Sequence, residues 1–471
     1  GCPCPMSLLR GQPQSRLTPS RPSGFSKKMN GPLGMNGYSG MTTRYFRQYE
    51  DLEDAFRRRI GTLLPRRHAG TALFWKDFQR LLHVPPKVPD DRRSEQYITS
   101  DPRDCLAFGT PLQVLRAARM TRAPRPSGAG PSVDDVVGRF DLARQLNQPV
   151  RSLSGGETVR LALAKAFIAA GRCGRLTLAS PFSWLSLHNR RYYHDLAEHC
   201  RRRCNAFEVF ALEGEDEVDA DVSGELTPGP DFDLRFRRAR VVLSSVFDRL
   251  QDRPKTAGIE DGEYRLHSPC LIQGDNGQGK SLVAKVLAGA MPRDGHAVLK
   301  TAGRAGRVRL LLQDFVNQTM MRRFRQLATG EDSLGAKGVG RFYEAIRADM
   351  TVGGALAPDE VRSFDAGCAA RAPASLIEFK ILLAALRLAS SPAALVMDEP
   401  DWGLRQTSAL AFVGAVIRVA HSAGIPVLLI SHKRWWRRWA GSGLQIDKTY
   451  IEPGEAVPAL FRIRIRRTET G

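Results

Sequence analysis

The 471-residue sequence has no apolar run that approaches the roughly 20 residues a helix needs to cross a bilayer. This excludes a protein that spans the membrane by itself, so a membrane role would need spanning subunits encoded separately. Runs such as 393–397 and 425–430 are short enough to be buried strands. Cysteine is also scarce: eight residues are scattered along the chain, with no disulfide-like spacing and no secretory signal. This favours a reducing, cytoplasmic location.

Acidic residues are in short supply as well. There are 49 Asp and Glu against 70 Lys and Arg, which gives a formal net charge of +21. The excess is compatible with a nucleic-acid or anionic-lipid partner, but arginine spread over the whole surface explains it without one. We favour the second interpretation, because we find no RNA- or DNA-binding motif. The segment 433–439 interleaves cations with tryptophans, and we interpret it as a helix that packs its tryptophans inward.

Composition and length predict an ordinary globular protein of two or three domains, since 42% of residues are hydrophobic and 25% charged. Residues 1–44 form a basic tail rich in Pro, Gly, Ser and Arg, which we predict to be disordered, with Met35 and Met41 as candidate start residues. A mixed helix and strand unit is predicted over 45–228 and another over 229–471. An acidic, turn-rich stretch at 213–233 lies between them.

The most informative motif reads G-x-x-x-x-G-K-S and has the strand and helix that a phosphate-binding P-loop requires on its two sides. Its apolar lead-in is 268–272, and a helix is predicted from 281 to 290. The glycines let the backbone wrap around phosphates, and the helix start adds partial positive charge. The lysine would contact phosphates and the serine would bind Mg²⁺. The motif consists of Gly274, Asp275, Asn276, Gly277, Gln278, Gly279, Lys280 and Ser281.

Polar residues follow three further apolar strands of the second unit. Gln313 ends 308–313, Asp398 and Glu399 follow 394–397, and His432 follows 427–431. Helices predicted at 376–388 and 407–420 alternate with these strands, which indicates a mainly parallel sheet. The carboxyl ends of parallel strands form the edge where ligands bind. Asp398 is suited to hold Mg²⁺, Glu399 to activate the attacking water, and His432 to bind the γ-phosphate.

In this order, the motifs resemble those of the ATP-binding-cassette (ABC) ATPases over about 235–435. The resemblance implies an α/β P-loop NTPase cassette, with a mainly parallel sheet and a helical subdomain, that binds ATP and Mg²⁺ and hydrolyses ATP. It implies that Ser281, Asp398 and Gln313 bind the metal. The catalytic residues that it implies are Glu399, His432 and Gln313.

One motif of that family is absent from the second unit and present in the first. The family's signature peptide should precede the helix at 376–388, but 373–378 has no glycine pair. The peptide occurs instead at 153–157, where Ser154, Gly155 and Gly156 open another predicted helix. In the family this helix start reaches the γ-phosphate held by a partner cassette. The resemblance therefore extends to a second cassette at 45–228.

The first cassette lacks the motifs that would serve a nucleotide of its own. We align 68–76 with the P-loop, where Thr71 stands in place of the lysine. Ala179 and Ser180 replace the metal aspartate and the catalytic glutamate, and the strand that should end in histidine is 209–213. A head-to-tail pair of cassettes would then build one complete site, with Ser154, Gly155 and Gly156 facing Lys280, and one degenerate site.

Three roles are open for such an ATPase. The first is the ATP-binding subunit of a transporter with separate membrane subunits, located at the inner face of the membrane; we favour it because it is the commonest use of the family. The second is a non-transport ATPase that acts on RNA or ribosomes or in enzyme activation. The signature type and the basic charge favour this role, but a short acidic linker and a single complete site do not. The third is a DNA-repair or chromosome ATPase, for which no zinc-binding insertion or long coiled coil is evident.

Overall fold

The computed structural model describes residues 41–60, 95–98, 105–106, 109–120, 131–150, 153, 155–170, 175–182, 185, 189–202, 204, 206–214, 226–243, 256–275, 277–291, 293–312, 333–352, 361–364, 375–451 and 459–468. Several positions singled out from the sequence lie outside this part of the chain: Ser154, Asn276, Gln313 and the segment 68–76. Among the described helices, none combines the length and the apolar character needed to cross a membrane.

The first half of the chain folds around a 4-stranded parallel sheet with the order β1-β4-β3-β2. The strands are β1 (Met41–Phe46), β2 (Glu95–Ile98), β3 (Arg175–Ala179) and β4 (Ala206–Leu212). The helices are α1 (Tyr49–Ile60), α3 (Pro111–Met120), α4 (Val133–Arg139), the 3-10 helix η3 (Ala143–Gln145), α5 (Gly155–Ala170) and α6 (Arg190–Arg201). Parallel strands need crossover connections, and α5 and α6 provide those before and after β3.

The second half contains an 11-stranded mixed sheet with the order β10-β9-β5-β6-β15-β14-β8-β13-β12-β11, in which β7 pairs with β5. Its strands are β5 (Asp231–Val242), β6 (Thr256–Ile259), β7 (Gly262–His267), β8 (Cys270–Gln273), β9 (Arg293–Thr301), β10 (Arg304–Ala305), β11 (Val308–Leu311), β12 (Ala394–Asp398), β13 (Val427–Ile430), β14 (Ser442–Tyr450) and β15 (Ala459–Thr468). Its helices are α8 (Lys280–Leu287), α10 (Ser333–Val352), α11 (Leu376–Ala389), α12 (Gln406–Ser422) and the 3-10 helix η6 (Arg434–Trp439).

Both halves contain the same parallel run of strands. The run β8-β13-β12-β11 repeats the order β1-β4-β3-β2, with the first two strands along the chain at opposite ends and the last two between them. The helices correspond too: α1 and α8 follow the first strand, α5 and α11 precede the third, and α6 and α12 precede the fourth. The chain is thus an α/β protein of two cassettes with a common topology.

Apolar packing joins the two halves. One buried cluster runs through the first half and continues into α10, α11 and α12 of the second. A second cluster lies between α8 and the strands of the large sheet. β12 is buried along its whole length, as expected for a central strand covered on both faces.

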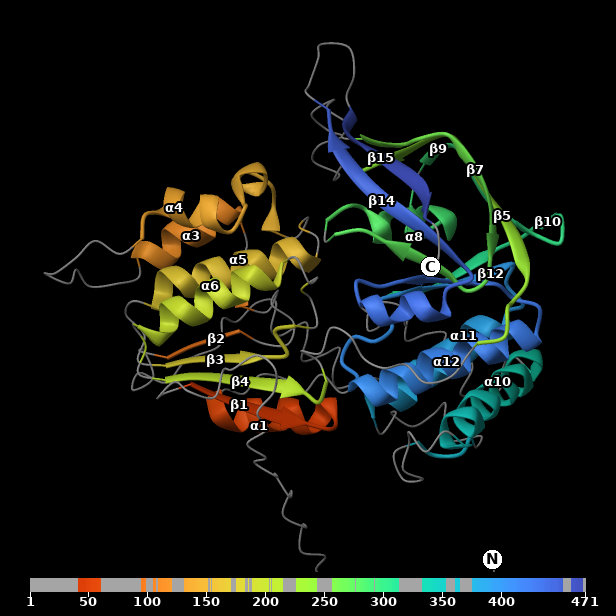
Figure 1. The fold of residues 1–471 in the computed structure, drawn as a ribbon, viewed down its shortest axis with the longest axis horizontal. Helices are drawn as coiled ribbons and strands as arrows, with labels where there is room; N and C mark the ends of the chain where they lie inside the picture. Colours follow the sequence, from red (N-terminus) through yellow and green to blue (C-terminus); the bar gives the residue numbers. More distant parts are fainter. Residues whose placement is uncertain are drawn as a thin grey trace, which may run out of the picture.

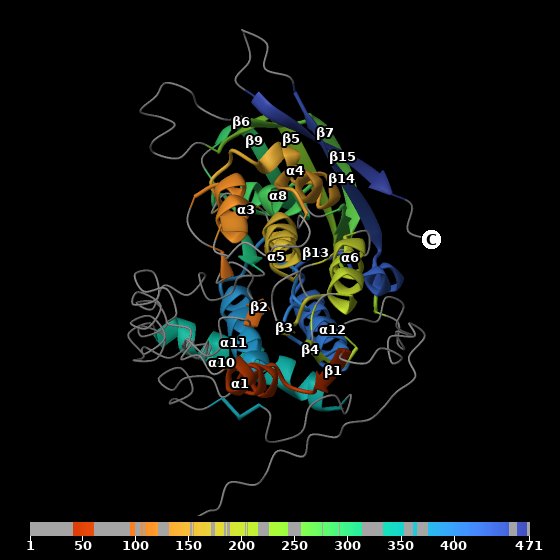
Figure 2. The same cartoon turned by 90° about the vertical axis from the view of Figure 1, so that its left-hand side faces the viewer.

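The halves lie side by side, and the arrowhead of β4 shows that the carboxyl ends of the first sheet face the second half (Figure 1). Since α5 leads into β3, which is parallel to β4, α5 runs back over the sheet and its first residue, Gly155, lies at the end toward the second half. In the turned view, α5 is seen nearly end-on (Figure 2). The start of α5 is therefore directed at the half that carries the P-loop.

Three expectations need adjustment. β1 begins at Met41, so the predicted tail boundary at residue 44 is too late; the polar sequence of β1 gave no strand signal. β5 begins at Asp231, inside the predicted acidic linker. The second sheet is mixed rather than mainly parallel, because β5 pairs antiparallel with β6, β7 and β9, and β14 pairs antiparallel with β15. Its parallel pairs are those of the run around the P-loop strand, the pair β8–β14 and the pair β6–β15.

Candidate nucleotide-binding site

The P-loop joins β8 to α8, as the sequence predicts, and its glycines adopt conformations that other residues rarely reach. Gly274, Gly277 and Gly279 have φ values of 145°, 83° and 99°. A Cβ atom on Gly274 would lie 2.5 Å from the carbonyl oxygen of Ile446. Glycine is therefore required at Gly274 both by the backbone conformation and by the close approach of β14.

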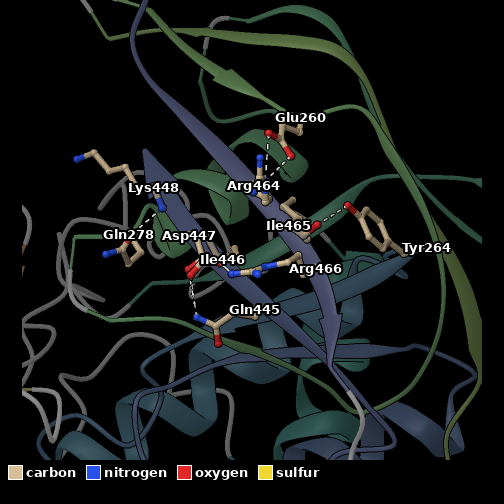
Figure 3. Close-up of polar contacts among 10 residues, drawn as sticks. All are labelled: Glu260, Tyr264, Gln278, Gln445, Ile446, Asp447, Lys448, Arg464, Ile465 and Arg466. Carbon is tan, nitrogen blue, oxygen red and sulfur yellow. Dashed lines mark hydrogen bonds and ion pairs between the residues drawn. The ribbon is translucent and has the colours of Figure 1, made fainter. Parts of the chain in front are cut away.

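Gln278 of the P-loop contacts the β14–β15 hairpin (Figure 3). The side-chain oxygen of Gln278 accepts a hydrogen bond of 2.6 Å from the backbone N–H of Lys448. The hairpin is itself fixed, since Tyr264 donates to the Ile465 carbonyl at 2.9 Å and Arg464 pairs with Glu260 at 3.1 Å. The hydrogen bond of the Gln278 side chain thus ties the P-loop to a hairpin that is itself fixed.

Lys280 and Ser281 open α8 at the inner side of the loop. The buried Lys280 ammonium donates to the carbonyl oxygens of Gly274 at 2.7 Å and of Asp275 at 3.1 Å. Ser281 hydrogen-bonds the carboxylate of Asp398 at the end of β12. The structure therefore brings the P-loop lysine and serine together with the first of the two predicted carboxylates.

Asp398 and Glu399 are both buried but differ in their surroundings. Burial, and then the neighbouring charge of Glu399, raise the pKa of Asp398 to about 6. Burial alone would also raise the pKa of Glu399, but His432 and Lys280 outweigh it and lower that pKa below its usual range. Glu399 therefore stays ionised to lower pH than Asp398, and an ionised carboxylate can accept a proton.

His432 follows β13 and lies beside this pair. Its Nδ1 is 2.9 Å from Glu399 Oε1, and since the ionised carboxylate only accepts, Nδ1 is the donor. In the described part of the chain, Asp398 Oδ1, Glu399 Oε2 and His432 Nε2 are buried polar atoms without a hydrogen-bond partner. Such atoms are costly unless they serve a ligand, so they fit a site for Mg²⁺ and the terminal phosphate of a nucleotide.

Glu399 and its counterpart in the first cassette share an unusual backbone. Glu399 and Ser180 both have φ of 48°, a left-handed conformation that costs about 1–3 kcal/mol for a residue other than glycine. Each follows the third strand of its run, and each donates its N–H to the neighbouring strand, at 2.8 Å to Ile430 and 2.7 Å to Phe210. Ser180 therefore occupies the place of Glu399, but has no carboxylate.

The P-loop counterpart of the first cassette is not where the sequence alignment put it. The strand at the place of β8 is β1, and only Arg47 and Gln48 separate it from α1. Tyr49 and Glu50 open α1 as Lys280 and Ser281 open α8. The segment 68–76 comes after this helix, so its alignment with the P-loop was wrong. The sequence of 41–46 is too polar to indicate a buried strand, which is why the sequence alone did not reveal β1.

The two signature positions also differ. Gly155 and Gly156 open α5, whereas Leu376 follows the N-cap residue Ser375 at the start of α11. The backbone N–H of Leu376 donates at 2.6 Å to the carboxylate of Glu50 on α1 of the first cassette. The counterpart of a P-loop helix thus contacts the counterpart of a signature helix across the two halves.

A buried lysine that the sequence analysis did not single out fixes the turn after Glu399. Lys380 on α11 donates to the carbonyl oxygens of Pro400 and Trp402, both at 2.6 Å. Burial lowers the pKa of Lys380 to about 7. The sequence did carry one signal for this residue, since a lysine stands among the apolar residues of a predicted buried helix. The inward-packing interpretation of 433–439 agrees with the burial of Trp436 and Trp439 in η6.

We expect Gly274→Ala to bind ATP on the order of 10-fold or more weakly, because the left-handed backbone and the contact with Ile446 together cost about 1–3 kcal/mol. Isothermal titration calorimetry measures this affinity. Gly138→Ala is the control, since a Cβ there meets nothing within 4 Å, and it should bind like the wild type. Equal affinities for the two variants would contradict the role of Gly274.

Comparisons with known proteins agree with this fold. No protein-family model matches the chain, and no curated protein sequence matches it. Among solved structures, it is similar to one described as a model of ribosome-bound archaeal Pelota and ABCE1, at 16% identity and a TM-score of 0.50, covering 89% of this chain and 69% of that one.

An RNase-L inhibitor structure is similar at 15% identity and a TM-score of 0.49, covering 91% of this chain and 86% of that one. An ATP-binding cassette of an ABC transporter in its ADP conformation covers 50% of this chain and 91% of its own length, at 15% identity and a TM-score of 0.33. At these identities similarity establishes the fold alone. In fold, the chain resembles tandem ABC ATPases, with two P-loop cassettes in one polypeptide.

Proposed function

We propose that the protein is an ATPase that hydrolyses ATP at a single composite site between its two cassettes. The observation that carries this proposal is the convergence of Lys280, Ser281, Asp398, Glu399 and His432 at one edge of the large sheet. Ser281 bonds to Asp398, His432 bonds to Glu399, and the charge of Lys280 acts on both carboxylates, so groups for phosphate binding, metal binding and proton transfer are gathered in one place. The first cassette has Ala179 and Ser180 at the corresponding acidic positions and so lacks this set.

The head-to-tail geometry of the composite site has its own support. Glu50 contacts Leu376, which joins the P-loop side of the first cassette to the signature side of the second. Two similar units in a head-to-tail pair make two such contacts, related by an approximate two-fold axis. The second contact would join Ser281 to Gly155, and α5 points its start in that direction. We infer that Ser154, Gly155 and Gly156 complete the site.

In this site each residue has one task. The P-loop backbone and Lys280 hold the β- and γ-phosphates, and the start of α5 would orient the γ-phosphate from the other side. Ser281 and Asp398, with Gln313 as the third predicted ligand, would hold Mg²⁺, which neutralises charge on the phosphates when bound. Glu399 Oε2 accepts the proton of the attacking water while His432 holds Oε1. Hydrolysis removes the group that bridges the halves and lets them separate.

A ribosome or another RNA-containing particle is the target we propose. The structure described as ribosome-bound Pelota and ABCE1 matches 89% of this chain, so the similarity extends over both cassettes. The net charge of +21 suits a polyanionic partner. The transporter role expected from the sequence is the second candidate. It rests on the composition and on the general use of the family, not on a feature of the site.

Glu399→Gln should lower turnover on the order of 100-fold or more, because the amide cannot accept the proton of the attacking water. ATP affinity should stay within about 3-fold of wild type, since the phosphate-binding groups are unchanged. Phosphate release and calorimetry measure the two quantities. Glu198→Gln, an exposed change on α6, is the control and should retain full turnover. Near-normal hydrolysis by Glu399→Gln would exclude Glu399 as the base.

Ser154→Arg should abolish ATP turnover but leave ATP affinity within about 3-fold, because it changes only the residue that the first cassette contributes. The same assays apply. Asn147→Arg adds the same charge at an exposed position of the first cassette and should leave turnover unchanged. Full turnover by Ser154→Arg would show that the site does not include the first cassette.

The target is tested by purifying the tagged Glu399→Gln protein with ATP from cells, since ATP retention should stabilise its complexes. We expect RNA and ribosomal proteins to co-purify and to be lost after nuclease treatment. The wild-type protein purified without ATP is the control and should retain less RNA and less ribosomal protein. Recovery of integral membrane proteins in place of RNA would support the transporter role and overturn the RNA target.

A further inference from the structure

The contact between Glu50 and Leu376 places a carboxylate at the start of a helix in the other half of the chain. The hydrogen bond is 2.6 Å long and joins residues 326 positions apart in the sequence. Burial raises the pKa of Glu50. The start of α11 carries the partial positive charge that favours an anion there. The protein thus supplies its own carboxyl group at the start of α11, where the signature peptide of a complete cassette would meet a phosphate.

An aromatic pair packs next to this hydrogen bond. Tyr49, next to Glu50, lies against Trp402 with ring centroids 5.5 Å apart and an angle of 50° between the rings. Both side chains are buried. Gly403 has φ of 72°, and a Cβ there would lie 2.6 Å from the Leu376 side chain. The start of α1 is therefore packed tightly against both the start of α11 and the turn 400–403.

The same turn leads directly from Glu399. Lys380, one turn of α11 after Leu376, holds the carbonyl oxygens of Pro400 and Trp402. A displacement of the start of α11 would therefore move the residues that follow the left-handed Glu399. A base displaced by about 1 Å can cost on the order of 100-fold in rate.

We propose that Glu50 is a positioning residue for ATP hydrolysis: its hydrogen bond to Leu376 holds α11 and the turn 400–403, and through them the carboxylate of Glu399. This inference rests on the proposed function. According to this proposal, the two halves stay in contact at the degenerate site, where Glu50 holds the start of α11. Only the composite site opens and closes with the nucleotide. The first cassette then contributes to catalysis from two places, the start of α5 and the start of α1.

The kinetic test compares substitutions of Glu50 in the full-length protein. Glu50→Ala removes the acceptor and should lower kcat on the order of 10-fold with KM for ATP unchanged. Glu50→Gln keeps an oxygen at the same reach and should restore most of kcat, a rescue that a purely electrostatic role would not give. Asp51→Ala, an exposed change one residue along α1, should behave as wild type. Glu50→Asp withdraws the carboxylate by one methylene and should lower kcat several-fold, which keeps the test informative if Glu50→Ala does not fold.

Hydrogen exchange of the same variants, without added nucleotide, tests the contact between Glu50 and the start of α11 separately from catalysis. The amides of 376–379 should exchange at least 10-fold faster in Glu50→Ala than in wild type and Asp51→Ala, while those of α12 stay unchanged. If the wild type is active and both Glu50→Ala and Glu50→Asp keep its kcat, the inference is overturned. A loss of kcat in these variants without faster amide exchange at 376–379 would overturn it as well. An inactive wild type would instead overturn the proposed function.

Discussion

Two adjacent carboxylates, Asp398 and Glu399, are buried at the end of β12, and the rest of the site depends on how their charge is balanced. Neighbouring buried anions repel each other, and each loses its hydration. Ser281 and His432 each give one of the two a hydrogen bond, and the positive charge of Lys280 favours the ionised form of both, although the pKa of Asp398 stays raised by burial. The P-loop, β12 and β13 must therefore meet at one edge, and the parallel run β8-β13-β12-β11 brings them there.

The first cassette has the same backbone arrangement but lacks these charged residues. It has the same strand order and the same left-handed residue after the third strand, but Ser180 stands where Glu399 does in the other half. Two residues replace the P-loop, and Glu50, in the first turn of the helix that follows them, accepts a hydrogen bond from the start of α11. One end of the interface thus carries the residues that we propose to be catalytic, while at the other end Glu50 bonds to Leu376.

The sequence predicted the motif-bearing elements well, because their apolar runs and glycines reflect burial and phosphate binding directly. The strands at 394–398 and 427–430 and the helices α8, α11 and α12 lie where expected. It did not predict β1, whose polar residues carry no burial pattern, and so the P-loop counterpart was placed at 68–76 instead of 47–48. Glu50 could not be found because its partner lies 326 positions away and the contact exists only where α1 meets α11. Lys380 stands out only as a lysine in an apolar helix, and the carbonyl groups that it holds carry no sequence signal.

The central claim is that one pocket joins the P-loop of the second cassette to the start of α5 in the first. Photocleavage with orthovanadate tests it most directly, because vanadate bound with Mg²⁺ and nucleotide takes the place of the γ-phosphate and cuts the backbone nearest to it under ultraviolet light. Two cuts are expected in the full-length protein, one at the P-loop near Ser281 and one near Ser154. A cut at the P-loop alone, or a second cut near Leu376, would contradict it.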